Sequence, residues 1–468
     1  MPVDTLASGQ VETESCMQIA GTVKPMMTPG RQARNEEIFR TVVHLLLSVA
    51  SWLRKSPTRC TSATSTTSFA KGNDMTTIAE HAAGELDRVR ITALKAMELR
   101  NSTGQSLVKV ETDAGLYGVG EAGVAGPACR ANLQWLERVL IGADPLNIDK
   151  LYHQMMGLQH TYQAHVPTIS GVDIALWDLS GKILGRSVSE LLTGRFRDRV
   201  EIYFGGGPPD WQDRAIIDDW VAQFRAHPHG YRTIKCGFPL PDDALLSRPF
   251  GSAAPSQSMK QSDFKTIGDG FARFREALGW DLDFIVHCHN EWDVPTAIGI
   301  CEAVAEAKPL WVEDPLQVWF SDGYKALREV APVRICTGEK IEGFRDFFPY
   351  ITEGAIDVLH LDLCWCGGLS GGRKIAELAD HYGLPVALHN CGTLVHNIAN
   401  IHFGACVRNF SMSESLLYAR DYIAAMGGLD GYDFVGGKIA VPDGPGLGIE
   451  LVDEVLRAEL KEGEPYWD

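Results

Sequence analysis

The sequence predicts an α/β protein: a modified TIM barrel of parallel strands, with a smaller α+β domain ahead of it. The main observation is a series of short apolar runs, each ending in a polar residue, at steps of 23 to 27 residues. Such a step fits one strand, one helix and two short loops. The polar ends are His287, Glu313, Glu339, Asp362, His389 and Glu414.

The segments between these runs have the pattern of helices. Residues 296–307 and 372–381 place apolar side chains at helical spacing. Apolar strands that alternate with amphipathic helices predict a parallel sheet covered by helices. An open, doubly wound sheet is the alternative, but it would not readily align polar residues on so many consecutive strand ends, as a (β/α)8 barrel does.

Residues 1–84 differ from the rest of the chain. Residues 56–77 are rich in serine and threonine, and residues 41–53 form an apolar run that is too short to span a bilayer comfortably. This run also begins too far from Met1 for an ordinary secretory signal. We predict a disordered or non-native extension here, with a natural start at Met75.

A small α+β domain is predicted over residues 85–197. Residues 91–99 and 106–121 have the pattern of antiparallel strands, with turn signals at 101–104 and 113–115. Helical segments follow around residues 131–141, 148–159 and 169–184. Strands followed by helices predict a unit separate from the barrel.

The barrel is predicted over residues 198–416. Residues 200–207 and 231–237 form its first two strands, ahead of the six runs described above. The insertion at 239–263 is far longer than a usual βα loop, and both a lid over substrate and a plain surface loop fit its composition. The turn-rich segment 417–468 contains a short strand at 438–442 and is expected to return to the small domain.

Composition excludes several classes of function. The net charge is −17 and basic clusters are absent, which argues against nucleic acid and anionic membranes as partners. The 11 cysteines lack paired spacing, and several, such as Cys236 and Cys336, lie in apolar strands as reduced core thiols do. We therefore expect a cytoplasmic protein without a disulfide framework.

Two glutamates at neighbouring strand ends suggest a metal site. Glu313 and Glu339 would project into the same mouth of the barrel, where buried carboxylates repel unless a positive group lies between them. A divalent cation that prefers hard oxygen ligands, Mg²⁺ or Mn²⁺, is the economical answer. Ion pairs with nearby lysines such as Lys340 are the alternative.

Other polar residues suggest acid–base chemistry. His287 and His289 alternate on one predicted strand, so one ring would complete the metal shell while the other serves as acid or base; two core histidines are the alternative. Asp362 would fix the tautomer of His389 and leave its other nitrogen as a base. Lys235 is a candidate for a second base or for an anchor that binds an anion. Glu414 is a candidate for a group that faces developing charge.

From about residue 89 onward, the chain resembles the enolase superfamily, specifically the mandelate racemase-like acid-sugar dehydratases related to galactonate dehydratase. The resemblance rests on several motifs in the right order and at the right spacing. They are residues 169–182, Trp311-Val-Glu-Asp-Pro315, Thr337-Gly-Glu-Lys340, Asp362 with Gly367-Gly368, and His389 with Glu414.

The resemblance implies a fold, a metal and a set of roles. The fold is a (β/α)7β barrel with a capping domain built from N-terminal and C-terminal segments. An essential Mg²⁺ would bind the substrate carboxylate and acidify the neighbouring proton. The implied roles are metal ligands at His287, Glu313 and Glu339, a base dyad of His389 with Asp362, an enediolate-stabilising Glu414, a base position at Lys235, and an acid, His289, that protonates the departing hydroxyl.

Two departures from the family pattern qualify these roles. His287 stands where the family ordinarily has aspartate, and imidazole suits Mn²⁺, Fe²⁺ or Zn²⁺ better than Mg²⁺, although Mg²⁺ remains the first expectation. The segment Lys235-Cys-Gly237 lacks the second lysine or histidine of the family's paired motif. Racemisation with Lys235 and His389 as bases stays open, while His289 favours dehydration.

We therefore expect a hydro-lyase that converts an aldonate or aldarate into a 2-keto-3-deoxy acid and, as is common in the family, assembles as a homo-oligomer. A racemase, epimerase or cycloisomerase of the same superfamily is the nearest alternative. An amidohydrolase-type hydrolase is more remote, because its paired histidines belong on the first barrel strand and here they lie on the third. A non-catalytic relative of the fold is the last alternative.

Overall fold

The computed structural model describes residues 89–100, 102–159, 165–237, 258–289, 292–415, 425–427 and 433–467. The predictions for residues 1–84 and for most of the 239–263 insertion lie outside these ranges; the end of that insertion, from Gln261 onward, begins a helix. No helix within these ranges is long and apolar enough to cross a membrane.

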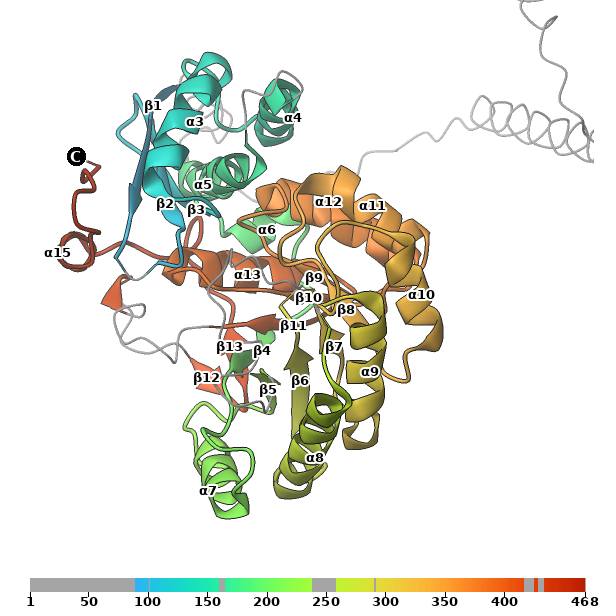
Figure 1. The fold of residues 1–468 in the computed structure, drawn as a ribbon. Coiled ribbons are helices and arrows are strands. Elements are labelled where there is room, and N and C mark those ends of the chain that lie inside the picture. The colour runs from blue at the N-terminus through green and yellow to red at the C-terminus, as the bar shows by residue number, and fades with distance from the viewer. Residues whose placement is uncertain are drawn as a thin grey trace, which may run out of the picture. The chain divides into compact units, whose positions relative to one another are not determined.

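The small domain has a three-stranded antiparallel sheet in the order β1–β2–β3, with helices packed against it (Figure 1). The hydrophobic core of this domain lies between the sheet and the helices. Its elements are β1 (Ile91–Glu98), β2 (Ser106–Thr112), β3 (Tyr117–Ala122), α3 (Gly126–Leu140), α4 (Ile148–Gln159), α5 (Val166–Leu184) and α6 (Val188–Leu192).

The second part is a closed barrel of eight parallel strands, because β4 pairs with both β5 and β11. The strands are β4 (Arg199–Gly205), β5 (Thr233–Cys236), β6 (Asp283–His287), β7 (Val312–Glu313), β8 (Ile335–Thr337), β9 (Val358–Leu361), β10 (Val386–Leu388) and β11 (Phe410–Glu414). This confirms the predicted modified TIM barrel with its capping domain.

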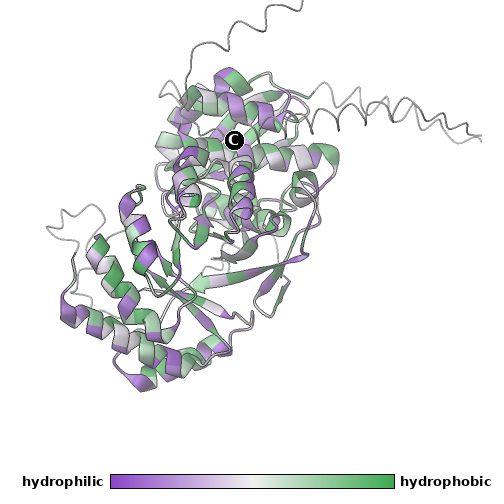
Figure 2. Ribbon diagram, turned by 90° about the vertical axis from the view of Figure 1, so that its right-hand side faces the viewer, coloured by the Kyte–Doolittle hydropathy of each residue, from purple (hydrophilic) through white to green (hydrophobic). Residues whose placement is uncertain are grey.

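Within the described ranges, seven α-helices alternate with these strands, which makes the barrel (β/α)7β. They are α7 (Arg214–Arg225), α8 (Gln261–Leu278), α9 (Val294–Val304), α10 (Asp322–Val330), α11 (Gly343–Thr352), α12 (Gly368–His381) and α13 (Leu394–Cys406). Several of these helices carry both apolar and polar residues along their length, as expected for helices with one face on the strands and one in water (Figure 2).

The alternation of side chains along the strands fills the barrel. One apolar cluster lies inside the ring of strands, and its buried members are Tyr203, Ile285, Trp311, Cys336, Val358, Ala387 and Met412. The neighbouring strand residues, such as Phe284 and Val286, join a larger core between strands and helices. Because the interior is packed, the space for chemistry lies at the carboxyl ends of the strands.

Glycines in β3 allow α5 to lie directly on its backbone. A Cβ on Gly118 would be 2.0 Å from the carbonyl oxygen of Ala175, and one on Gly120 would be 2.0 Å from that of Gly171. Neither obstacle is a flexible side chain, so a methyl group at either glycine would push α5 away from the sheet.

Replacement of Gly120 by alanine is therefore expected to lower the free energy of unfolding by about 2–3 kcal/mol, measured by urea denaturation. Gly157→Ala is the matched control, because Gly157 is an exposed position in α4 with nothing within 4 Å of an added Cβ. That change should be neutral or stabilising by up to roughly 1 kcal/mol. Equal stability of the two variants would contradict the close contact between α5 and β3.

Buried carboxylates of the capping domain bind backbone donors of the barrel helices. Glu121 accepts hydrogen bonds from the Thr393 N–H at 2.8 Å and the His396 N–H at 3.0 Å, at the start of α13. Asp173 of α5 accepts one from the Ser370 N–H in the first turn of α12, at 2.9 Å. These N–H groups have no partner within their own helix, so each carboxylate caps a barrel helix.

The C-terminal segment contacts both parts of the molecule. The short strand β13 (Lys438–Ala440) pairs antiparallel with β4 of the barrel. Farther along, Leu460 forms a bridge with Leu99 of the capping domain, and Glu464 forms an ion pair with Arg130 of α3 at 2.5 Å.

Candidate active site

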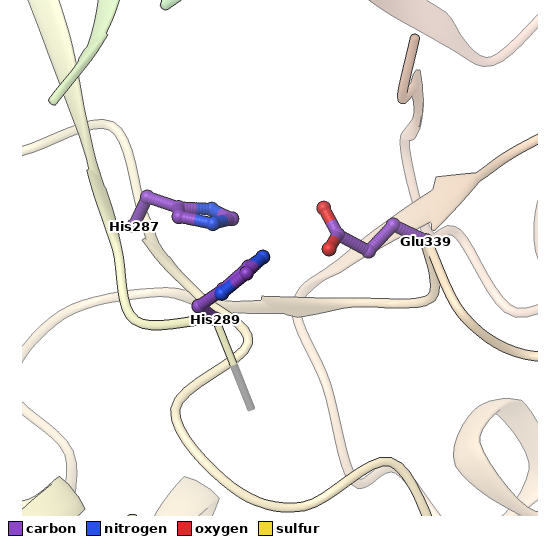
Figure 3. Close-up of side chains that lie close together, drawn as sticks. All are labelled: His287, His289 and Glu339. Carbon is purple, nitrogen blue, oxygen red and sulfur yellow. The ribbon is translucent and has the colours of Figure 1, made fainter. Parts of the chain in front are cut away.

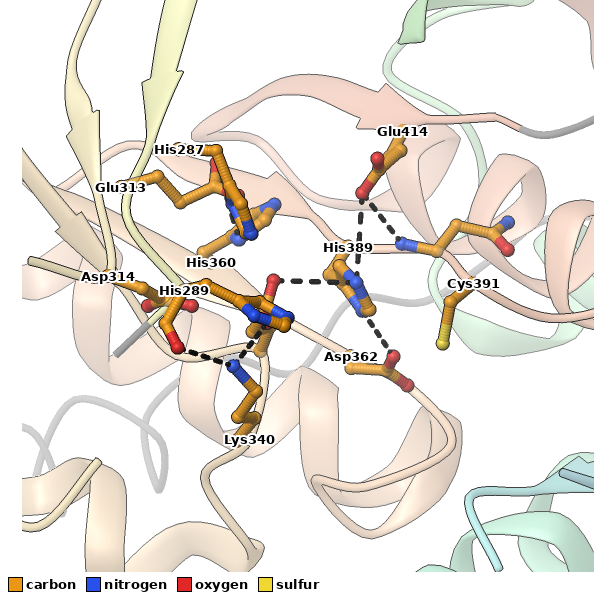
Figure 4. Close-up of polar contacts among 12 residues, drawn as sticks. His287, His289, Glu313, Asp314, Lys340, His360, Asp362, His389, Cys391 and Glu414 are labelled. Carbon is orange, nitrogen blue, oxygen red and sulfur yellow. Dashed lines mark hydrogen bonds and ion pairs between the residues drawn. The ribbon is translucent and has the colours of Figure 1, made fainter. Parts of the chain in front are cut away.

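All eight predicted site residues meet at the carboxyl ends of the barrel strands. Figure 4 labels all of them except Lys235 and Glu339. Hydrogen bonds, ion pairs and one ring contact of 5.0 Å between His287 and His289 connect them into a single cluster. The spacing of the βα units is the reason, because parallel strands bring their carboxyl ends to the same edge.

His389 and Asp362 form the predicted dyad. His389 Nδ1 lies 2.7 Å from Asp362 Oδ2, and the Cys364 N–H donates to the other carboxylate oxygen at 2.7 Å. His389 Nε2 points towards the centre of the cluster, 3.4 Å from Glu339 and 3.8 Å from Glu414. Burial lowers the pKa of His389 well below its usual range, so the ring is neutral at neutral pH. With its one proton on Nδ1, towards Asp362, the ring can accept a proton at Nε2.

Lys235 lies between two buried glutamates. Its Nζ is 2.7 Å from Glu414 Oε2 and 3.2 Å from Glu313 Oε1. Burial alone would lower the pKa of Lys235, but the charges of Glu313 and Glu414 raise it well above its usual range. Lys235 is thus an ammonium ion at neutral pH, which supports a role as an anchor for negative charge rather than as a base.

Glu313 is surrounded by hydrogen-bond donors. His287 Nδ1 lies 2.8 Å from Oε1, and the Trp311 indole N–H donates to Oε2 at 3.0 Å. Burial opposes ionisation, but His360 and Lys235 hold the pKa of Glu313 well below its usual range. As an ionised carboxylate only accepts hydrogen bonds, the proton in this contact lies on His287 Nδ1. Burial and the Lys235 ammonium oppose protonation of this ring, but the Glu313 and Glu339 carboxylates raise the pKa of His287 above its usual range.

His289 reaches the cluster through an unusual backbone conformation. The strand β6 ends at His287, so the strand alternation used for the prediction does not extend to His289. His289 instead has a φ of 63°, a left-handed conformation that is costly for a residue with a Cβ and that clusters at functional sites. Burial and the Lys340 ammonium lower the pKa of His289 to about 4, which leaves a neutral ring.

The residues at the mouth fit a divalent cation. One ligand atom each from His287, His289 and Glu339 lie within 4.8 Å of one another (Figure 3). Glu339 Oε2 is buried and accepts no hydrogen bond from the described residues, whereas Oε1 pairs with Lys340 Nζ at 2.9 Å. A buried carboxylate oxygen without a donor beside two imidazoles is the chemistry expected of a metal site.

The alternative to a metal, in which lysines pair with the two glutamates, also has contacts in its favour: Lys340 Nζ lies 2.9 Å from Glu339 Oε1, and Lys235 Nζ lies 3.2 Å from Glu313 Oε1. These pairs leave Glu339 Oε2 without a hydrogen bond from the described residues. Glu313 joins a different group of potential ligands, with Cys336 and His360, whose ligand atoms also lie within 4.8 Å of one another.

Sequence reasoning missed several residues of the cluster. His360 is fully buried beneath the mouth, with Nε2 2.9 Å from the Tyr203 hydroxyl and Nδ1 3.8 Å from Glu313. Strand alternation could have found it, because His360 lies on β9 and precedes Asp362, which directly follows that strand, by two positions. His396 Nε2 lies 3.5 Å from Asp362, but it comes from α13, and no pattern in the sequence pointed to it.

Comparison with known families agrees with this architecture. Residues 88–193 match the model of the mandelate racemase/muconate lactonizing enzyme N-terminal domain. Residues 221–455, about half of the chain, match the enolase C-terminal domain-like family. Members of the superfamily bind a divalent metal, usually Mg²⁺.

Individual relatives cover most of the chain. The D-gluconate dehydratase of Thermoproteus tenax is 28% identical over 382 residues, which is 77% of this chain and 72% of that protein. The D-galactarolactone cycloisomerase of Agrobacterium fabrum is 31% identical over 365 residues, 75% of this chain and 89% of the relative.

A solved structure extends the likeness to three dimensions. The mandelate racemase/muconate lactonizing enzyme-like protein from Rubrobacter xylanophilus has a TM-score of 0.72 and 27% identity, and the match covers 81% of this chain and 99% of that one. The chain is therefore an enzyme of the enolase superfamily and belongs to its mandelate racemase-like subgroup.

Proposed function

We propose that the protein is a metal-dependent hydro-lyase that removes water from a sugar acid, an aldonate or aldarate, to give a 2-keto-3-deoxy acid. The observation that carries the proposal is the position of His389 Nε2. This nitrogen is oriented by Asp362 and lies 3.4 Å from Glu339, the carboxylate with an oxygen left for a cation. A base and a cation site side by side suit abstraction of a proton next to a carboxylate.

The metal belongs at His287 and Glu339, with Glu313 or His289 as the further protein ligand. A bound divalent cation supplies the positive charge that makes the proton at C2 of a carboxylate substrate acidic. His389 Nε2 then takes this proton, and Asp362 stabilises the imidazolium through Nδ1. The Lys235 ammonium supplies positive charge beside the developing enediolate. Glu414 lies 2.7 Å from Lys235, and burial raises the pKa of Glu414, which favours the protonated form that can donate a hydrogen bond.

Loss of the C3 hydroxyl completes the reaction. The hydroxyl leaves with the proton that His389 has just taken from C2. His289, the acid expected from the sequence, has a neutral ring here and would have to take up a proton before it could serve in this role. The electron pair of the broken C2–H bond forms the new double bond as the C3–O bond breaks, and the resulting enol becomes the 2-keto acid.

The capping domain is in a position to select the sugar. Thr103 donates a hydrogen bond to the Cys391 carbonyl at 3.0 Å, and Gln105 Nε2 lies 2.9 Å from Cys391 Sγ, two residues after the proposed base. Gln105 Oε1 is buried without a hydrogen-bond donor among the described residues. We propose that the segment 100–106, together with the insertion at 239–263, sets the stereochemistry of the substrate.

The test is a screen of the purified protein against a panel of aldonates and aldarates, with Mg²⁺ and then Mn²⁺, using semicarbazide to detect 2-keto-3-deoxy acids. We expect at least one acid sugar to be dehydrated. Incorporation of solvent deuterium at C2 without loss of water would instead favour a racemase or epimerase. Neither reaction on any member of the panel, with metal bound, would overturn the proposal.

The proposal includes a reducing compartment, such as the cytoplasm, and a small-molecule substrate. It is supported by the nine cysteines in the described ranges, which are all free, eight of them buried. A homo-oligomer remains part of the proposal, and sedimentation equilibrium would measure its size.

A further inference from the structure

Glu313 already has hydrogen-bond or ion-pair partners at both carboxylate oxygens, so it is the potential ligand least available to a metal. It is fully buried, and both of its oxygens are engaged: Oε1 by His287 Nδ1 and the Lys235 ammonium, Oε2 by the Trp311 indole. Lys235 Nζ lies 3.2 Å from Oε1. A cation bound to Oε1 would have to displace this ammonium group or be repelled by its positive charge. The geometry therefore favours Glu313 as the partner of His287, not as a ligand.

The contact between Glu313 and His287 is itself a feature of metal sites. A histidine that binds a metal through one ring nitrogen almost always donates its other N–H to a carboxylate or carbonyl, which fixes the ring and makes it a better ligand. His287 donates Nδ1–H to Glu313 at 2.8 Å, which leaves Nε2 for the cation.

His289 is then the third ligand within reach. Its ring centroid lies 5.0 Å from that of His287, and both ligand atoms lie within 4.8 Å of the Glu339 carboxylate (Figure 3). The left-handed backbone at His289, with φ at 63°, holds this ring at the mouth at a conformational cost that a residue on a regular strand would not incur.

We infer that this protein binds its metal with His287, His289 and Glu339, and that Glu313 orients His287 from behind. The inference concerns the cation on which the proposed dehydration depends. Two imidazoles and one carboxylate prefer Mn²⁺, Fe²⁺, Co²⁺ or Zn²⁺ to Mg²⁺, which takes oxygen ligands. A metal-bound His289 cannot also protonate the leaving hydroxyl, so His389 carries the proton both ways.

Pulsed electron paramagnetic resonance of Mn²⁺ bound to the metal-stripped wild-type protein tests the ligand set without turnover. We expect couplings from the ring nitrogens of both histidines. We also expect calorimetry to give tighter binding of Mn²⁺ and Co²⁺ than of Mg²⁺. Coupling from a single histidine, or tightest binding of Mg²⁺, would overturn the inference.

Variants separate the ligand from its hydrogen-bond partner. His289→Ala should change the visible absorption spectrum of bound Co²⁺ and weaken its binding by more than the roughly 10–100-fold that loss of an outer partner costs. Glu313→Gln should fall within that range and keep the spectrum. The control is His381→Ala, which removes an exposed histidine at the end of α12.

The reverse pattern, with Glu313→Gln altering the spectrum and His289→Ala silent, would overturn the inference. The wild-type resonance experiment decides the question even if a variant does not fold. If the nitrogen couplings appear while the acid-sugar screen stays silent, the proposed dehydration fails and the ligand assignment stands.

Discussion

Replacement of His389 by asparagine is expected to lower kcat by about 10³-fold or more, because the side chain that takes the proton from C2 would be gone. Asparagine is close to histidine in size and can still donate a hydrogen bond to Asp362, which now lies 2.7 Å from His389 Nδ1. The buried carboxylate therefore keeps a partner, and the loss should be one of chemistry and not of folding.

Two readouts distinguish this loss from structural damage. The thermal midpoint of the variant should stay within a few degrees of the wild type. Exchange of the C2 proton of a substrate with solvent deuterium, followed by nuclear magnetic resonance, should stop together with dehydration. Near-normal turnover of His389→Asn would remove His389 from the role of base.

The second large effect is expected from Lys235→Met. Methionine fills similar space but leaves Glu313 and Glu414 buried without the ammonium that now lies 3.2 Å and 2.7 Å from them. Removal of one partner from a buried ion pair costs about 3–5 kcal/mol, because the remaining charge stays uncompensated. Urea denaturation in the presence of a chelator should show a loss of this size, since a bound cation would mask part of it.

A double variant checks the cause. Lys235→Met combined with Glu414→Gln removes one of the exposed charges and should recover part of the lost stability. Lys265→Met is the matched control, because Lys265 forms its ion pair with Asp269 on the surface of α8, where such pairs contribute little. If the buried and the surface lysine gave equal losses, Lys235 would not be the charge that compensates the two glutamates.

The unit spacing was sufficient to place most of the barrel and its mouth. Each polar strand end is separated from the next by one helix and two loops, so residues such as Glu339 and His389 had to converge once the barrel was recognised. His360 was missed although it lies on the same strand, because a histidine within an apolar run has the same pattern as a core residue.

Other features depend on three-dimensional contacts between side chains and on local backbone conformation, which no periodic pattern in the sequence encodes. The sequence shows that His287 and Glu313 end neighbouring strands, but not that they would bind each other at 2.8 Å. The left-handed backbone at His289 breaks the alternation from which its position was predicted. Lys235 was a candidate base because burial was expected to lower its pKa. The two carboxylates beside it raise its pKa instead.

The carboxylates of Glu121 and Asp173 have a consequence for how this protein could evolve. Because each accepts a hydrogen bond at the start of a barrel helix, a capping domain taken from a relative would have to supply carboxylates at the same two places. A recombinant that lost Glu121 would leave the start of α13 with bare N–H groups just beyond His389. Changes of substrate are therefore easier to reach through the loops of the resident cap than by exchange of the whole domain.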